Sequence, residues 1–223
     1  MFAGHVGAAL AIGRAERRVN IGVFITAALL LDLVLWVLVL LDIESVVIPA
    51  NFAATHQPEF NFPYSHGLVA AIAWSTLAGL AVFIGFNRLQ GAKLRAAALV
   101  GAAVFSHWLL DALVHAPELP LAGAGSMKFG LRLWNQMPIA LAVEAALVLV
   151  GLYLFVREAS LPRARANSLT VMALLLLAFT SAGMTIAPPP PSVQAMATSS
   201  LVALLVVCAI ACWLGRLPKQ KRA

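Results

Sequence analysis

Six continuous apolar runs of about 20 residues limit the fold of this chain more than any other feature of its sequence. A helix of that length, rising about 1.5 Å per residue, spans the hydrocarbon core of a bilayer. Hydrophobic residues make up 62% of the 223 residues and charged residues only 11%, whereas soluble domains contain about a quarter charged residues. Because the runs are continuous rather than alternating, they favour helices over barrel strands. We therefore predict an all-α, polytopic membrane helical bundle that forms one integral membrane domain, residues 1–223.

The predicted elements are six transmembrane helices and one short N-terminal helix. The short helix covers residues 1–13 and is too short to cross a bilayer. The sequence leaves open whether this helix dips into the bilayer or lies on its surface. The spans are predicted at residues 20–41, 66–86, 95–115, 138–156, 169–187 and 193–214.

Basic residues predict the orientation of these spans, because cytoplasmic loops carry an excess of Lys and Arg. If the N-terminal arginines are cytoplasmic, 13 of the 15 basic residues fall on that side, and the other side holds only Lys128 and Arg132. The cytoplasmic set is Arg14, Arg17, Arg18, Arg88, Lys93, Arg95, Arg157, Arg163, Arg165, Arg216, Lys219, Lys221 and Arg222. We expect the basic N- and C-terminal segments to be cytoplasmic. The net charge of +6 lies in short loops beside the bilayer and indicates no nucleic-acid partner.

Ionisable side chains occur inside the apolar runs, where each costs several kcal/mol and by default marks a functional site. At about 1.5 Å per residue, four of them lie about 7 to 14 Å below the outer ends of their spans: Asp32, His107, Asp111 and Glu144. His5 reaches the middle of the bilayer, and His66 and His115 lie at the outer boundary. The sequence thus predicts that polar groups from several helices meet in the outer half of the bundle.

The strongest local pattern is the segment Ser106–His115, SHWLLDALVH. His107 and Asp111 are four residues apart and share one helical face, with His115 one turn further along. Such a pair offers two metal donors from one rigid helix, and imidazole with carboxylate suits zinc, iron or manganese. The alternatives are a structural hydrogen bond between spans, protonated carboxylates, and an interfacial role for His115. His56, in the predicted loop 42–65, is expected to be exposed to solvent.

The order of these motifs resembles that of the bacterial inner-membrane metal-dependent hydrolases (YdjM-like). The family shows Gly-His, Pro-Asp-x-Asp, Arg-Gly-x-Thr-His-Ser and Ser-His-x-x-x-Asp motifs. The matching positions here are Gly4-His5, Leu31-Asp32, Ser65-His66 and Ser106-His107 with Asp111. The second carboxylate of the Pro-Asp-x-Asp motif is replaced by Val34, and the resemblance covers about the first 120 residues. It implies a multi-pass protein of the bacterial cytoplasmic (inner) membrane.

Two functions follow as hypotheses from the residues and the resemblance. In the first, a hydrolase holds a divalent metal ion, zinc or manganese, with His66, His107 and Asp111 as ligands. His5 and Asp32 are further ligands or residues that support the ligands, and Asp32 is also a candidate catalytic residue. Glu144 is then the general base or acid, and the substrate is a lipid or lipid-linked ester or phosphoester near the outer face. In the second, a small transporter uses the same carboxylates to bind a proton or cation. A non-catalytic family member is a third alternative.

Overall fold

The computed structural model describes residues 1–86, 91–158 and 161–216, and it confirms the predicted all-α class. Within these residues, five helices are long and apolar enough to cross a membrane. They are α5 (Leu68–Gly85), α6 (Lys93–Val114), α7 (Met137–Glu158), α8 (Arg163–Thr185) and α9 (Val193–Leu214). Helix α8 begins at Arg163 rather than at the predicted residue 169, because Pro162 serves as its N-cap and the helix extends beyond its apolar part.

The span predicted at residues 20–41 is broken, which corrects the expectation of a single helix. It consists of α2 (Ile21–Ala28) and α3 (Leu30–Leu40), which are bent by 49° at Leu29. Counting this pair as one span gives the predicted six. No Pro or Gly marks the break in the sequence; instead, the His107 ring approaches from α6 and binds the Ala28 carbonyl. A side chain that binds a backbone group in this way is a recognised cause of a sharp helix bend.

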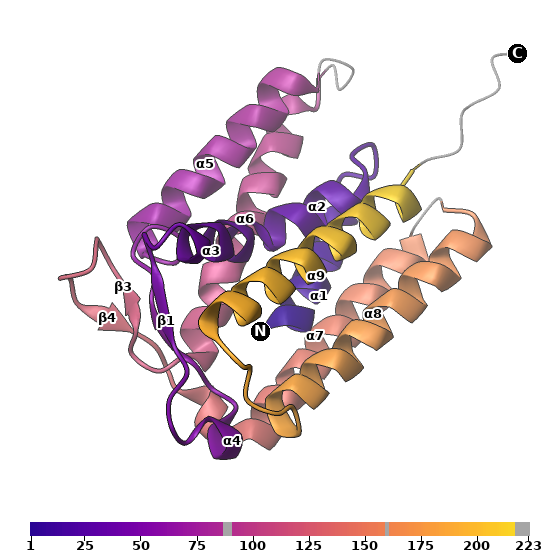
Figure 1. The fold of residues 1–223 in the computed structure, drawn as a ribbon. Helices are drawn as coiled ribbons and strands as arrows, with labels where there is room; N and C mark the ends of the chain where they lie inside the picture. Colours follow the sequence, from indigo (N-terminus) through magenta and orange to yellow (C-terminus); the bar gives the residue numbers. More distant parts are fainter. Residues whose placement is uncertain (87–90, 159–160, 217–223) are drawn as a thin grey trace, which may run out of the picture.

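The short N-terminal helix α1 (Phe2–Gly13) lies inside the bundle, against α2, α6, α7 and α8 (Figure 1). Its packing on α7 depends on two glycines. A Cβ atom on Gly7 would lie 2.5 Å from the Leu147 carbonyl carbon, and a Cβ on Gly151 would lie 3.1 Å from Gly7 Cα. The two backbones therefore meet without intervening side chains, as small residues allow in membrane helices. This contact places His5 deep in the protein.

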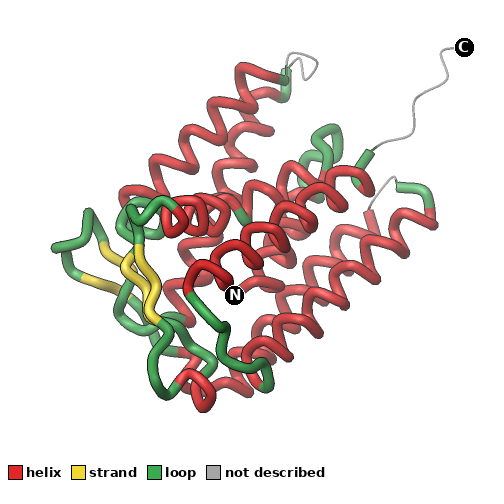
Figure 2. The backbone as a smooth tube through the Cα atoms, in the orientation of Figure 1, coloured by secondary structure: helices red, strands yellow, loops and turns green. Residues whose placement is uncertain are grey.

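One end of the bundle, which we call the loop face, carries two small hairpins (Figure 2). Strands β1 (Ser45–Val47) and β2 (Glu59–Asn61) pair antiparallel with Val46 opposite Phe60, and the short helix α4 (Phe52–Thr55) lies between them. Strands β3 (Leu119–Pro120) and β4 (Lys128–Phe129) form the second hairpin, and the 3-10 helix η1 (Leu133–Gln136) leads into α7. The segments predicted as long loops thus have defined structure above the bundle.

The opposite end, which we call the basic face, is formed by the α1–α2 turn, the start of α6, the end of α7, the start of α8 and the end of α9 (Figure 1). The described basic residues of the set predicted to be cytoplasmic lie in or next to these segments. Arg14 and Arg17 bind Glu158, which ties the α1–α2 turn to the end of α7. Hydrogen bonds from Arg18 hold the pKa of Glu16 below its usual value. Arg88, Lys219, Lys221 and Arg222 lie outside the described residues.

Candidate metal centre

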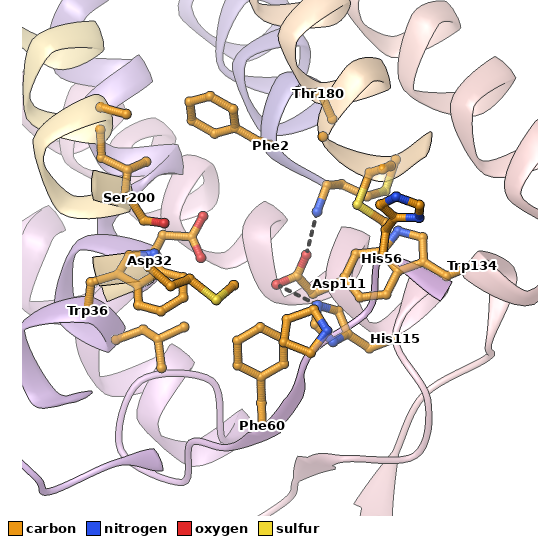
Figure 3. A pocket seen from close by; sticks show the side chains of 18 of the residues that line it. Phe2, Asp32, Trp36, His56, Phe60, Asp111, His115, Trp134, Thr180 and Ser200 are labelled. Atoms are coloured by element: carbon orange, nitrogen blue, oxygen red, sulfur yellow. Dashed lines mark hydrogen bonds and ion pairs between the residues drawn. The ribbon is translucent and has the colours of Figure 1, made fainter. Parts of the chain in front are cut away.

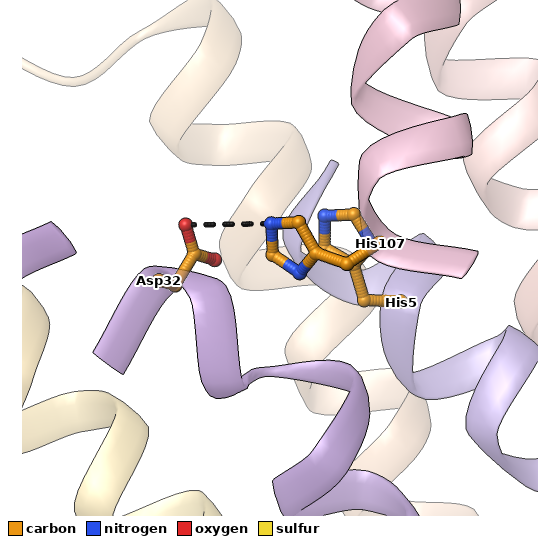
Figure 4. Close-up of side chains that lie close together, drawn as sticks. All are labelled: His5, Asp32 and His107. Atoms are coloured by element: carbon orange, nitrogen blue, oxygen red, sulfur yellow. Dashed lines mark ion pairs between the residues drawn. The ribbon is translucent and has the colours of Figure 1, made fainter. Parts of the chain in front are cut away.

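The residues predicted from the sequence come together in the loop-face half of the bundle, each from a different element or turn. His5 comes from α1, Asp32 from the first turn of α3, His107 and Asp111 from α6, and His66 from the residues just before α5. The partial positive charge at the start of α3 stabilises the negatively charged Asp32 carboxylate. Figure 4 shows Asp32 facing His107, with the His5 ring behind it.

Four side-chain atoms form the centre of the site. His66 Nε2 and His107 Nε2 lie 3.1 Å apart. Asp111 Oδ2 is 3.4 Å from His66 Nε2 and 3.1 Å from His107 Nε2. Asp32 Oδ1 is 3.6 Å and 3.7 Å from the same two nitrogens. The two histidines and Asp111 are buried, whereas the Asp32 side chain is 21% exposed.

The tautomer of His107 follows from its other nitrogen. Nδ1 lies 2.6 Å from the Ala28 carbonyl oxygen, which can only accept a hydrogen bond. That carbonyl is at the end of α2, where helix carbonyls lack partners within the helix. His107 therefore donates from Nδ1, and in the neutral ring Nε2 carries a lone pair that points into the site.

The tautomer of His66 is fixed by a chain of hydrogen bonds to the loop face. Ser65 Oγ donates its proton to Glu44 Oε2 at 2.6 Å, and Glu44 also accepts from the backbone N–H groups of Tyr64 and Ser65. The Ser65 hydroxyl must therefore accept from His66 Nδ1, which lies 2.8 Å away. As in His107, the lone pair of neutral His66 is on Nε2.

His115 has the same arrangement one turn along α6. Its Nδ1 donates to Glu118 Oε1 at 2.6 Å, and its Nε2 lies 3.8 Å from Asp111 Oδ2. His115 is buried. Glu44 and Glu118 were missed by the sequence analysis. In the sequence, the position of Glu118 three residues after His115 was the only indication of a contact. Nothing in the sequence indicated the role of Glu44.

Two nitrogen lone pairs and two carboxylates that face one another repel, and either a bound cation or a shared proton would relieve this repulsion. A tetrahedral ion with bonds of about 2.0–2.1 Å to its ligands separates those ligands by about 3.3 Å. The separations of 3.1 to 3.4 Å among His66 Nε2, His107 Nε2 and Asp111 Oδ2 fit that requirement. Histidines that bind a metal ion through one ring nitrogen also typically donate a hydrogen bond from the other ring N–H group to a carboxylate or a carbonyl. The described residues therefore form a group that could hold a metal ion.

His5 belongs to a second possible group with Asp32 and His107. Its ring stacks on that of His107, with centroids 3.7 Å apart and planes 7° apart. His5 Nε2 lies 3.2 Å from Asp111 Oδ1, the carboxylate oxygen that also lies 3.3 Å from the Met1 amino nitrogen. His107 has only one nitrogen available to an ion, so the two groups share one position rather than forming two independent sites.

Glu144 of α7 lies at the edge of the cluster. Its carboxylate interacts with the backbone N–H groups of Ala3 and Gly4 in the first turn of α1. Its Oε2 atom is buried without a hydrogen-bond partner among the described residues. A buried carboxylate oxygen without a protein partner is uncommon and leaves an acceptor that a ligand at the site could use.

These groups open onto a cavity of about 350 Å³ (Figure 3). Asp32, His66, Asp111, His115 and Glu144 form its polar part, and Trp36, Phe60, Phe62 and Trp134 are among its aromatic lining residues. His56, expected to be exposed, is half-buried and lines the same cavity. The backbone of His56 is in the left-handed conformation directly after α4, and this turn brings the chain back over the site.

No family model, curated protein or solved structure matches the chain.

Proposed function

We propose that this protein is a membrane-embedded metal-dependent hydrolase of the bacterial cytoplasmic membrane. The observation that carries the proposal is the pair of Nε2 atoms of His66 and His107, 3.1 Å apart, whose Nδ1 atoms both act as donors elsewhere. Asp111, with Asp32 beside it, completes the ligand set. The resemblance to the YdjM-like hydrolases agrees with this ligand set. Two imidazoles with carboxylates favour zinc or manganese.

A single ion is the simplest occupant. His107 offers only Nε2, and the chain has Val34 where the family has a second carboxylate. Asp111 would bind through Oδ2, while His5 Nε2, which lies 3.2 Å from Oδ1, would hold the carboxylate in place as a hydrogen-bond donor. We thus assign His5 to orienting Asp111 rather than to direct binding.

The chain's own residues would supply binding and proton transfer. A bound divalent ion lowers the pKa of its water towards 7. Glu144 Oε2, which has no hydrogen-bond partner among the described residues, would take up a proton at this site and return it to the leaving group. The apolar cavity walls would exclude bulk water and hold the hydrocarbon part of a lipid or lipid-linked ester or phosphoester. By the distribution of basic residues, the loop face is the outer side.

Cation-coupled transport is the second candidate, and the break between α2 and α3 favours it. Transporters commonly bind ions at broken helices, and Asp32 follows this break by three residues. However, within the described spans, the ionisable side chains gather in the loop-face half and do not continue as a path towards the basic face. The hydrolase therefore accounts for more of the site.

The test is hydrolysis of a lipid panel by the protein in nanodiscs loaded with zinc or manganese. The panel contains glycerophospholipids and isoprenoid-linked phosphoesters, and products are identified by mass spectrometry. We expect turnover of at least one class, its loss in Asp111→Asn, and its retention in Glu59→Gln, at an exposed loop-face position outside the cavity lining. Metal-loaded protein that hydrolyses no lipid but catalyses cation flux in proteoliposomes would favour transport instead.

A further inference from the structure

The cavity continues away from the metal ligands between the loop-face halves of α8 and α9. Phe179, Gly183 and Met184 line it from α8, and Met196, Ala203 and Leu204 line it from α9. Figure 3 shows Phe2, Thr180 and Ser200 around the same space as Asp111. Helix α8 packs on α1 and α7, α9 packs on α2 and α3, and α8 and α9 also contact each other. The cavity therefore runs between two neighbouring helices that pack mainly on different parts of the bundle.

This part of the cavity reaches the lipid-facing surface. Phe179 lines the cavity although 62% of its surface is exposed. Its ring contacts the edge of Phe2 in α1, with centroids 6.3 Å apart. A Cβ atom added to Gly183 would meet no atom within 4 Å. In a helix that crosses a bilayer, such an opening faces hydrocarbon rather than water.

One polar atom in this apolar wall lacks a partner. Thr180 is 8% exposed, and its Oγ1 has no hydrogen-bond partner among the described residues. On the same helix, the hydroxyls of Thr170, Ser181 and Thr185 each donate to the carbonyl four residues earlier. Helical Ser and Thr normally satisfy their hydroxyls in this way. Thr180 lines the cavity instead, which points to a ligand that accepts its hydrogen bond.

The part of the cavity lining that comes from α8 and α9 is uncharged, and its polar residues are Thr180, Ser199 and Ser200. The charged groups of the lining, which are the carboxylates of Asp32, Asp111 and Glu144 and the Met1 amino group, come from other elements. The cavity volume of about 350 Å³ is near the lower end of the about 300–1,000 Å³ typical of small-ligand pockets. The space suits one hydrocarbon chain with a neutral polar group at its end.

We propose that one acyl chain of a membrane lipid enters sideways between α8 and α9 and lies in this cavity, with its ester oxygen accepting a hydrogen bond from Thr180 Oγ1. The inference rests on the proposed function for the identity of the reacting ester. Binding of the chain itself needs no metal ion, so the two can be tested separately.

The test is photo-crosslinking of metal-free, full-length protein in nanodiscs that contain a phosphatidylcholine with a diazirine on one acyl chain. Labelled peptides are located by mass spectrometry. We expect labelling to concentrate on the cavity residues of α8 and α9, and to fall about fivefold or more in Gly183→Trp and in Ala203→Trp, which fill the cavity from opposite walls. Gly85→Trp is the matched control, because a Cβ at Gly85 also meets nothing within 4 Å but lies on α5, away from the cavity.

Thr180→Val tests the polar contact. The loss of one neutral hydrogen bond corresponds to a roughly 2- to 10-fold weaker binding of ester-linked lipids, the probe included. An unlabelled ether-linked lipid, which lacks the ester carbonyl, should therefore compete with the probe roughly 2- to 10-fold better in Thr180→Val than in the wild type. Uniform labelling of all lipid-facing helices, or unchanged cavity labelling in folded Gly183→Trp and Ala203→Trp, overturns the inference. If hydrolysis persists under that result, the proposed function stands and only the access route fails.

Discussion

His66 Nε2 and His107 Nε2 lie 3.1 Å apart, and each ring already donates its Nδ1 proton to an acceptor outside the site. Neither nitrogen therefore has a proton to share with the other while both rings are neutral. Asp111 Oδ2 faces both nitrogens and adds negative charge. A bound cation resolves this repulsion, and the whole account of the site depends on it.

The link from Glu44 through Ser65 to His66 should control metal affinity. Glu44→Gln removes the carboxylate that accepts a hydrogen bond from the Ser65 hydroxyl. His66 then loses the series of hydrogen bonds that orients its ring. Mutations of such outer partners typically weaken metal binding about 10- to 100-fold, and we expect that range. Competition with a chromophoric chelator measures the change. Glu59→Gln, at an exposed position on the same hairpin, should bind metal like the wild type.

Glu144→Gln should separate catalysis from metal binding. The amide retains the shape of the side chain but cannot take up a proton, whereas the ligand atoms of His66, His107 and Asp111 are untouched. We expect turnover of the lipid substrate to fall about 100- to 10,000-fold, with metal content unchanged. Single-turnover kinetics and elemental analysis on the same sample measure both quantities. Equal activity of the variant would remove Glu144 from the mechanism.

The contact between α1 and α7 should be sensitive to a single methyl group. In Gly151→Ala the new Cβ would lie against the Gly7 backbone, 3.1 Å from its Cα. Overpacking of this kind costs about 1–3 kcal/mol, which for a chain of this size lowers Tm by roughly 3–10 °C. Thermal unfolding in detergent measures the shift. Gly85→Ala, whose Cβ meets nothing within 4 Å, is the control, and an equal Tm for both variants would contradict the packing described here.

Apolar run length and ionisable residues in those runs predicted most of the architecture and the centre of the site. The helical class and the grouping of His5, Asp32, His66, His107 and Asp111 needed only helix geometry and the cost of burying charge. The break at Leu29 could not be predicted, because its cause is a tertiary contact from His107 to the Ala28 carbonyl. Glu44 was missed for a related reason: it lies in a loop, and its contact with Ser65 spans 21 residues.

The most direct test of the metal centre is elemental analysis of detergent-purified protein after reloading with zinc or manganese. The wild type, His107→Ala, Asp111→Ala and the conservative Asp111→Asn are compared with His56→Ala, and circular dichroism confirms that each is folded. We predict about one ion per chain in the wild type and in His56→Ala, and loss of the ion in the other three. No metal in any folded protein, or equal metal in all of them, would contradict the account.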